Sequence, residues 1–140
     1  MQNEKTSLNL SIALLLIRVS TGGLLLFHGI AKLMHGHDFI RAMLAGKGLP
    51  GFFWLGVPLT EVIAPILLLL GVFTRMAGVG ITVLMLITIF LAHMPNAFSV
   101  TDTGGLEVEL NLLYLSGALA LVFAGPGKFH IISPSKYWLQ

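Results

Sequence analysis

Four long apolar stretches divide this sequence, and short polar or glycine-containing segments separate them. A helix needs about 20 predominantly apolar residues to cross the hydrocarbon core of a bilayer. Because lipid offers no hydrogen-bond partners, apolar runs of this length fold as helices, which satisfy their own backbone groups. The pattern therefore predicts an all-α fold, an integral membrane four-helix bundle with transmembrane helices over 8–34, 52–73, 76–95 and 106–124.

The connections between these helices differ in length and composition. Residues 35–51 form the longest one, and its Phe39, Met43 and Leu44 favour a short amphipathic helix on the membrane surface. Gly125-Pro126-Gly127 ends the fourth helix, because proline removes a helical hydrogen bond and clashes with the preceding turn. Small residues inside the helices are interpreted as packing contacts, since helices in lipid associate through close backbone approach. They include Gly22, Gly23, Gly29, Gly78, Gly80 and Gly117.

Composition agrees with a chain that lies in lipid. Of its 140 residues, 56% are hydrophobic and 10% are charged, whereas a soluble domain carries about 25% charged residues. One domain over 1–140 is the natural expectation at this length. The charges are scattered, so the sequence predicts no nucleic-acid surface, and a small basic surplus fits contact with anionic lipid. The chain has no cysteine, which excludes disulfides and thiol redox chemistry carried by this chain alone.

The first apolar stretch is interpreted as a retained helix, because no small-residue cleavage site follows its early part. Lys and Arg residues in short loops set the orientation of membrane helices. The side with both termini holds four of them, and the other side holds three, so the balance narrowly predicts cytoplasmic termini. The two sets are Lys5, Arg75, Lys128 and Lys136 against Lys32, Arg41 and Lys47.

Polar side chains inside the expected helices carry the functional information. An ionisable group at membrane depth costs on the order of 2.5–3.5 kcal/mol on insertion scales, so each one needs a partner or a function. Because consecutive helices run in opposite directions, nearly all of these groups fall toward the membrane face with the 35–51 and 96–105 loops. Only Arg18 lies toward the other face. The candidate ligand-binding residues are His28, Lys32, Glu61, His93, Asn111, Arg18, Glu109 and Tyr114.

The functional hypothesis is a polar pocket near one membrane face, built by His28, Lys32, Glu61, His93 and Asn111. Lys32 and Glu61 would form a charge pair that lowers their joint burial cost, and the histidines would bind a ligand or pass a proton. The alternative is a network that only fixes helix packing. Lysine and arginine can also reach the headgroups with long side chains, and histidine or tyrosine can lie at the interface.

Other site types receive less support. No zinc-type spacing occurs, so no metal site is predicted. A haem held by His28 and His93 would require both rings to face the bundle axis at matching depth. The sequence contains no nucleotide-binding loop and no nucleophile elbow, so catalytic residues stay unassigned.

The order and spacing of several short motifs resemble the DoxX family of small four-helix membrane proteins. The resemblance covers most of the chain, from Arg18 to Gly127. Two departures are Ala97, where the family often has glycine, and Lys128-Phe129-His130, where many members have a serine-leucine-aspartate stretch. The matching pieces are Arg18 with Gly22, His28-Gly29-Ile30-Ala31-Lys32-Leu33, Leu49-Pro50, Glu61, Gly71-Val72-Phe73-Thr74-Arg75, His93-Met94-Pro95-Asn96-Ala97-Phe98, Glu109 with Asn111 and Tyr114, and Gly125-Pro126-Gly127.

The resemblance implies a multi-pass protein of the cytoplasmic membrane of a prokaryote, in a family associated with thiosulfate:quinone oxidoreduction. The first interpretation is an accessory or binding subunit for a quinone or lipid-like amphiphile in a redox-linked membrane complex. Its partners would be the lipid bilayer and membrane or redox subunits. No cofactor is evident besides such a quinone. One alternative is a quinone-linked oxidoreductase subunit, and another is a small oligomeric transporter or channel. Whether the chain is an enzyme stays open at this stage.

Overall fold

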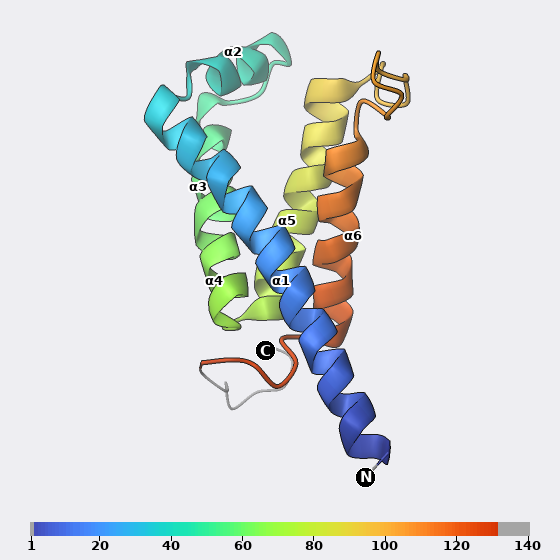
Figure 1. Ribbon diagram of the computed structural model, residues 1–140. Coiled ribbons are helices and arrows are strands. Elements are labelled where there is room, and N and C mark those ends of the chain that lie inside the picture. The colour runs from blue at the N-terminus through green and yellow to red at the C-terminus, as the bar shows by residue number, and fades with distance from the viewer. Residues whose placement is uncertain (1, 132–140) are drawn as a thin grey trace.

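The structure is a computed structural model that describes residues 2–131. Within this range the backbone is helical apart from turns and one isolated β-bridge between Val100 and Leu106. Helix α1 (Gln2–His35) runs along the whole molecule, and α2 (Asp38–Gly46) lies across its carboxyl end (Figure 1). The all-α prediction is confirmed for the described residues, and the short helix expected in the 35–51 connection is present.

The second apolar stretch is one continuous path built from four helical pieces. A 3-10 turn η1 (Gly51–Leu55) leads into α3 (Gly56–Pro58), a π-helical turn η2 (Leu59–Ile63) and α4 (Ala64–Leu70). Pro65 lacks the N–H that would bond the carbonyl four residues earlier, and this loss accounts for the widened turn just before it. Turns of this kind occur frequently at functional sites.

The remaining stretches form α5 (Thr74–Thr88), the π-helical turn η3 (Ile89–His93) and α6 (Glu109–Ala124). The predicted start of the fourth helix at residue 106 is wrong. Leu106 pairs with Val100 and the Glu107 N–H donates to the Ser99 carbonyl, so these residues close a turn before the helix begins.

Three helical spans are long and apolar enough to cross a membrane, and they are Ser7–His35, Gly51–Leu70 and Thr74–His93. The fourth helix, α6, is apolar but has only 16 residues, fewer than the roughly 20 that a full span needs. The structure therefore confirms three helical stretches of membrane-spanning length, expected over 8–34, 52–73 and 76–95. Most of their ends differ from the expected ends by one to a few residues. The larger shift, at the start of α1, adds the polar residues before Ser7.

Helix packing follows the small residues. Helices α5 and α6 lie side by side, and α1 crosses in front of them and contacts α4 (Figure 1). A Cβ added to Gly78 would come within 3.0 Å of the Ala118 carbonyl oxygen, so this glycine permits the α5–α6 contact. Gly23 has nothing within 4 Å of an added Cβ, so its predicted packing role is wrong. Large apolar side chains cover the outside of the bundle, as lipid contact requires; they include Phe27, Phe90 and Phe123.

Candidate functional site

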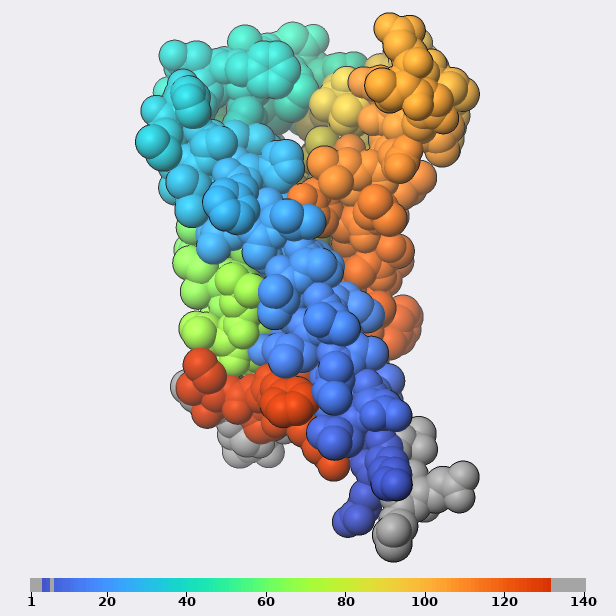
Figure 2. Space-filling model, in the orientation of Figure 1, coloured from blue at the N-terminus to red at the C-terminus, as the bar shows by residue number. Residues whose placement is uncertain are grey.

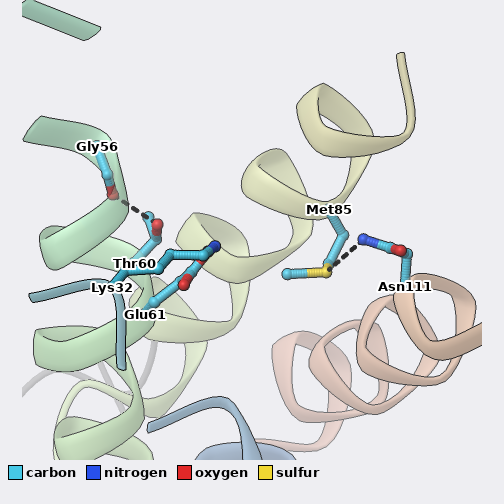
Figure 3. A network of polar contacts seen from close by, with 6 residues as sticks. All are labelled: Lys32, Gly56, Thr60, Glu61, Met85 and Asn111. Carbon is cyan, nitrogen blue, oxygen red and sulfur yellow. Dashed lines mark hydrogen bonds and ion pairs between the residues drawn. The ribbon is translucent and has the colours of Figure 1, made fainter. Parts of the chain in front are cut away.

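An ion pair between Lys32 of α1 and Glu61 of η2 forms the centre of the candidate site (Figure 3). The Lys32 Nζ lies 2.5 Å from Glu61 Oε1. The Glu61 side chain is only 4% exposed, whereas the Lys32 side chain is 40% exposed. The charge pair expected from the sequence is thus present, with its carboxylate buried and its ammonium open on one side.

Gly29 sets the distance between the two elements that carry this pair. A Cβ at Gly29 would lie 2.2 Å from the Glu61 carbonyl oxygen, so only glycine permits the observed approach of α1 to η2. Lys32 follows one helical turn later on α1, which places its stem beside the Glu61 side chain. The hydroxyl of Thr60 donates to the Gly56 carbonyl at 2.6 Å, so that proton is not available to the carboxylate.

The second carboxylate oxygen of Glu61 has no hydrogen-bond partner among the described residues, although it is buried. A buried acceptor without a donor costs about 1–3 kcal/mol, and more when it is charged. Such an atom calls for an explanation, and a functional role is one of the accepted ones.

A cavity of roughly 350 Å³ adjoins this carboxylate. Its walls come from the carboxyl end of α1, from α2, from α3 and η2, and from α5 with η3. Apolar side chains dominate, and the polar groups are few. The lining residues are Ala31, Lys32, His35, Gly36, Phe39, Ile40, Met43, Val57, Glu61, Leu84, Thr88 and Ala92. We call this space the α2 pocket.

Helix α2 covers the pocket and is fastened to η1. The rings of His37 and Trp54 lie 4.1 Å apart at an interplanar angle of 66°, and the Arg41 guanidinium lies 5.1 Å from the Trp54 ring centre. The buried face of α2 consists of Ile40 and Leu44. Phe39, which the sequence placed on the same face as Leu44, is largely exposed.

The other candidates at this end of the bundle make separate contacts. The His28 ring meets the Tyr114 ring edge-on, with centroids 6.1 Å apart. The Asn111 amide donates to the Met85 sulfur at 3.6 Å, so it is directed at α5 (Figure 3).

His93 and Glu109 are not among the residues that line the α2 pocket. His93 Nδ1 is 3.7 Å from Glu107 Oε1, a partner outside the predicted site. Glu109 is exposed beside Gly105, whose added Cβ would meet its carboxylate. Among the described residues, no group of three or more His, Cys, Asp or Glu side chains is arranged to hold a metal ion.

The family model described as DoxX matches residues 13–94, more than half of the chain. The chain belongs to the DoxX family. The matched region contains residues 13–35 of α1 together with α2, η2 and α5, and it includes every residue that lines the α2 pocket.

Two proteins of Haemophilus influenzae, each described as an uncharacterized protein, are similar to this DoxX protein. One is 35% identical over 115 residues, which cover 79% of this chain and 81% of the relative. The other is 31% identical over 87 residues, which cover 58% of this chain and 56% of the relative, so the match spans little more than half of that protein. No solved structure matches the chain.

Arg18, the remaining candidate, lies apart from the pocket at the opposite end of the bundle. Its side chain is buried, and its guanidinium donates to four backbone carbonyls. Two belong to Leu68 and Leu69 at the end of α4, at 2.7 and 3.0 Å. The others belong to Pro126, at 3.0 Å, and Phe129 in the C-terminal segment. Arg18 therefore fastens helix ends together and does not extend to the headgroups.

Arg75 has a similar contact that the sequence analysis did not anticipate. Its Nη1 donates to the Val122 carbonyl at 2.6 Å, near the end of α6. A cation at the carboxyl end of a helix satisfies free carbonyls and complements the helix dipole. Arg75 lies at the start of α5, and Gly125-Pro126-Gly127 follows the end of α6. The sequence shows both features but not that the two helices are neighbours, so the contact could not be predicted from it.

Proposed function

We propose that this DoxX-family protein is an accessory or binding subunit in a redox-linked membrane complex, and that the α2 pocket receives the head of a quinone or lipid-like amphiphile. The observation that carries the proposal is the buried carboxylate of Glu61, a residue that lines the cavity. It pairs with Lys32 through one oxygen, and its other oxygen has no hydrogen-bond partner among the described residues. Small-molecule sites are typically apolar cavities with a few placed polar groups, and this pocket has that composition.

The position of the pocket supports an amphiphilic ligand. It lies at the carboxyl end of a membrane-spanning helix, beneath a short helix whose polar residues include Asp38 and Arg41. A polar head would meet Lys32 and Glu61, while an apolar tail would leave between helices toward lipid. Apolar lining such as Leu84 and Val57 suits a flat ring or an acyl chain.

The proposed role is binding, with electron transfer supplied by a partner. The chain has no cysteine, so thiol–quinone chemistry would need another subunit. We place the protein in the cytoplasmic membrane of a prokaryote with both termini cytoplasmic; the bacterial source of both relatives supports the first part and the narrow lysine and arginine balance the second.

A transporter is the less favoured alternative. It needs a water path from Arg18 to the polar groups at the other end. Leu25 of α1 and Ile81 of α5 lie at the intervening level, and both are buried in the apolar core. Arg18 itself is held by backbone carbonyls.

Native mass spectrometry of the detergent-solubilised protein tests the proposed function. The probes are decylubiquinol, decylubiquinone and phosphatidylglycerol, each added separately. We expect at least one probe to be retained at one molecule per chain. The double variant Lys32→Met/Glu61→Gln should retain it at least ten-fold less, because losing hydrogen bonds to charged groups removes about 1.5–3 kcal/mol.

The double variant removes both charges together, so neither is left buried without its partner, and we expect it to fold. The matched control is Lys47→Met, which removes an exposed lysine from the connection after α2. Equal retention by the wild type and the double variant, or no retention of any probe by the wild type, would overturn the proposal.

A further inference from the structure

We infer that the α2 pocket selects amphiphiles whose head carries a hydroxyl group over matched heads that carry only carbonyl or ester oxygens. This inference rests on the proposed function and adds the chemical class of the ligand. It rests on the hydrogen bonds that Lys32 and Glu61 make, and on which of their donor and acceptor atoms have no partner.

The first step concerns the hydrogen bonds of the Glu61 carboxylate. Its Oε1 accepts from Lys32 at 2.5 Å, and its Oε2 is buried with no donor within reach among residues 2–131. An ionised carboxylate only accepts hydrogen bonds, so the missing partner must be a donor. The nearby Thr60 hydroxyl does not fill this role, because it donates to Gly56.

The second step is the spare capacity of Lys32. An ammonium has three N–H donors, and one of them is directed at Glu61 Oε1. The side chain is 40% exposed, so its other donors are accessible from the pocket. A ligand oxygen in the pocket would therefore accept from Lys32, and it would reach the buried Glu61 Oε2 through a rotation of that carboxylate toward the pocket.

The third step compares the two kinds of ligand oxygen at that position. A hydroxyl accepts from Lys32 and donates its own proton to Glu61, which satisfies both groups. A carbonyl accepts from Lys32 but presents lone pairs to the carboxylate, and Oε2 stays unsatisfied. A site built to hydrogen-bond a hydroxyl rejects an analogue that lacks it, because the buried polar group is left without its partner.

The other residues that line the pocket restrict the chemical class of the ligand further. His35 bonds the Ala31 carbonyl through Nδ1 at 2.8 Å, so this nitrogen is already engaged. Ile40, Met43 and Leu84 supply apolar walls. Among membrane amphiphiles, a quinol and a lipid with a glycerol head each combine a hydroxyl with apolar bulk. Their shared chemistry is a hydroxyl that donates to Glu61.

The test measures the affinity of two matched pairs in phosphatidylcholine nanodiscs, with empty nanodiscs as the partition control. One pair is decylubiquinol against decylubiquinone, and the other is phosphatidylglycerol against phosphatidylpropanol, which carries the same charge and lacks the hydroxyl groups. We expect the hydroxyl member of at least one pair to bind at least ten-fold more tightly, which is about 1.4 kcal/mol. The pair that discriminates identifies the source of the hydroxyl.

The variant Glu61→Gln separates this inference from the proposed function. Its amide presents a donor toward the pocket, so the preference should fall below two-fold or reverse toward the carbonyl form. If both members of each pair bind equally to the wild type, or if the preference survives in Glu61→Gln, the inference is overturned. In that outcome the proposed function still stands whenever Lys32→Met/Glu61→Gln abolishes binding, and it fails when no probe binds or when the double variant binds as well as the wild type.

Discussion

Replacing Gly29 with alanine is expected to lower the free energy of unfolding by about 3 kcal/mol or more, since overpacking against an immobile neighbour costs this much. The added Cβ would lie 2.2 Å from the carbonyl oxygen and 2.6 Å from the carbonyl carbon of Glu61. These are backbone atoms, so no rotamer change relieves the contact. Helix α1 must therefore move away from η2, and the Lys32–Glu61 pair must lengthen.

The matched control is Gly23→Ala in the same helix, where an added Cβ meets nothing within 4 Å. That substitution should leave stability unchanged or raise it by up to about 1 kcal/mol, because alanine favours helices over glycine. Unfolding by SDS titration in mixed micelles measures both variants. Equal stability of Gly29→Ala and Gly23→Ala would contradict the close approach of α1 to η2. Probe retention should also fall in Gly29→Ala alone.

The second large effect is expected for Arg18→Ala, with a loss of about 3 kcal/mol or more in the free energy of unfolding, because each buried carbonyl left without a donor costs about 1–3 kcal/mol. The guanidinium holds four carbonyls, two at the end of α4 and two in the C-terminal segment. Without it these acceptors lose their donor in a buried setting. Arg18→Lys should be intermediate, because a compact ammonium cannot reproduce the planar array of donors.

Two readouts check the Arg18 prediction. The melting temperature in detergent reports stability, and trypsin cleavage after Lys128 reports release of the C-terminal segment. Lys5→Ala serves as the control, since it removes an exposed positive charge from the same helix. A melting temperature for Arg18→Ala that matches Lys5→Ala, with an equally slow cleavage rate, would show that Arg18 does not fasten the helix ends.

Hydropathy was sufficient to predict the membrane-spanning stretches and the short helix after α1, because lipid forces apolar runs into helices. It missed the internal structure of the second stretch, where proline widens the helix to a π-turn at Glu61. It also extended the last helix to Leu106, because a β-bridge of two apolar residues looks the same in composition as a helical turn.

The candidate site was predictable to a similar degree. Opposite helix directions placed Lys32 and Glu61 at one depth, and their charges then make a pair favourable in lipid. Asn111 and His93 were less predictable, since each is engaged by a partner on a neighbouring element, Met85 and Glu107. Side-chain depth does not specify which neighbour a group will contact when several lie within reach.

Arg18 shows a further limit of sequence analysis. Its partners are backbone carbonyls, whose positions depend on where α4 ends and on how the C-terminal segment returns. No residue type marks them. The unpaired Glu61 oxygen is equally invisible in sequence, because it requires knowing that Thr60 is engaged elsewhere and that Lys32 reaches only one oxygen. Both features can be recognised only in a three-dimensional structure.

The shape of the molecule agrees with a site at one end. Figure 2 shows that the surface is continuous around the lower half of α1, while a gap separates the upper end of α1 from the loop that follows η3. The pocket lining belongs to this upper end. A ligand would therefore enter beside α2, and the end held by Arg18 would stay closed.

Photo-cross-linking tests the central claim most directly. A decyl-tailed phenol that carries a diazirine on its ring is irradiated with the protein in nanodiscs, and labelled residues are identified by tandem mass spectrometry. We predict labels on Met43, Val57 and Leu84 of the α2 pocket, suppressed by excess unlabelled phenol and absent in Lys32→Met/Glu61→Gln. Labels confined to lipid-facing residues such as Phe90 and Phe123, unaffected by competitor or variant, would contradict a binding site in the α2 pocket.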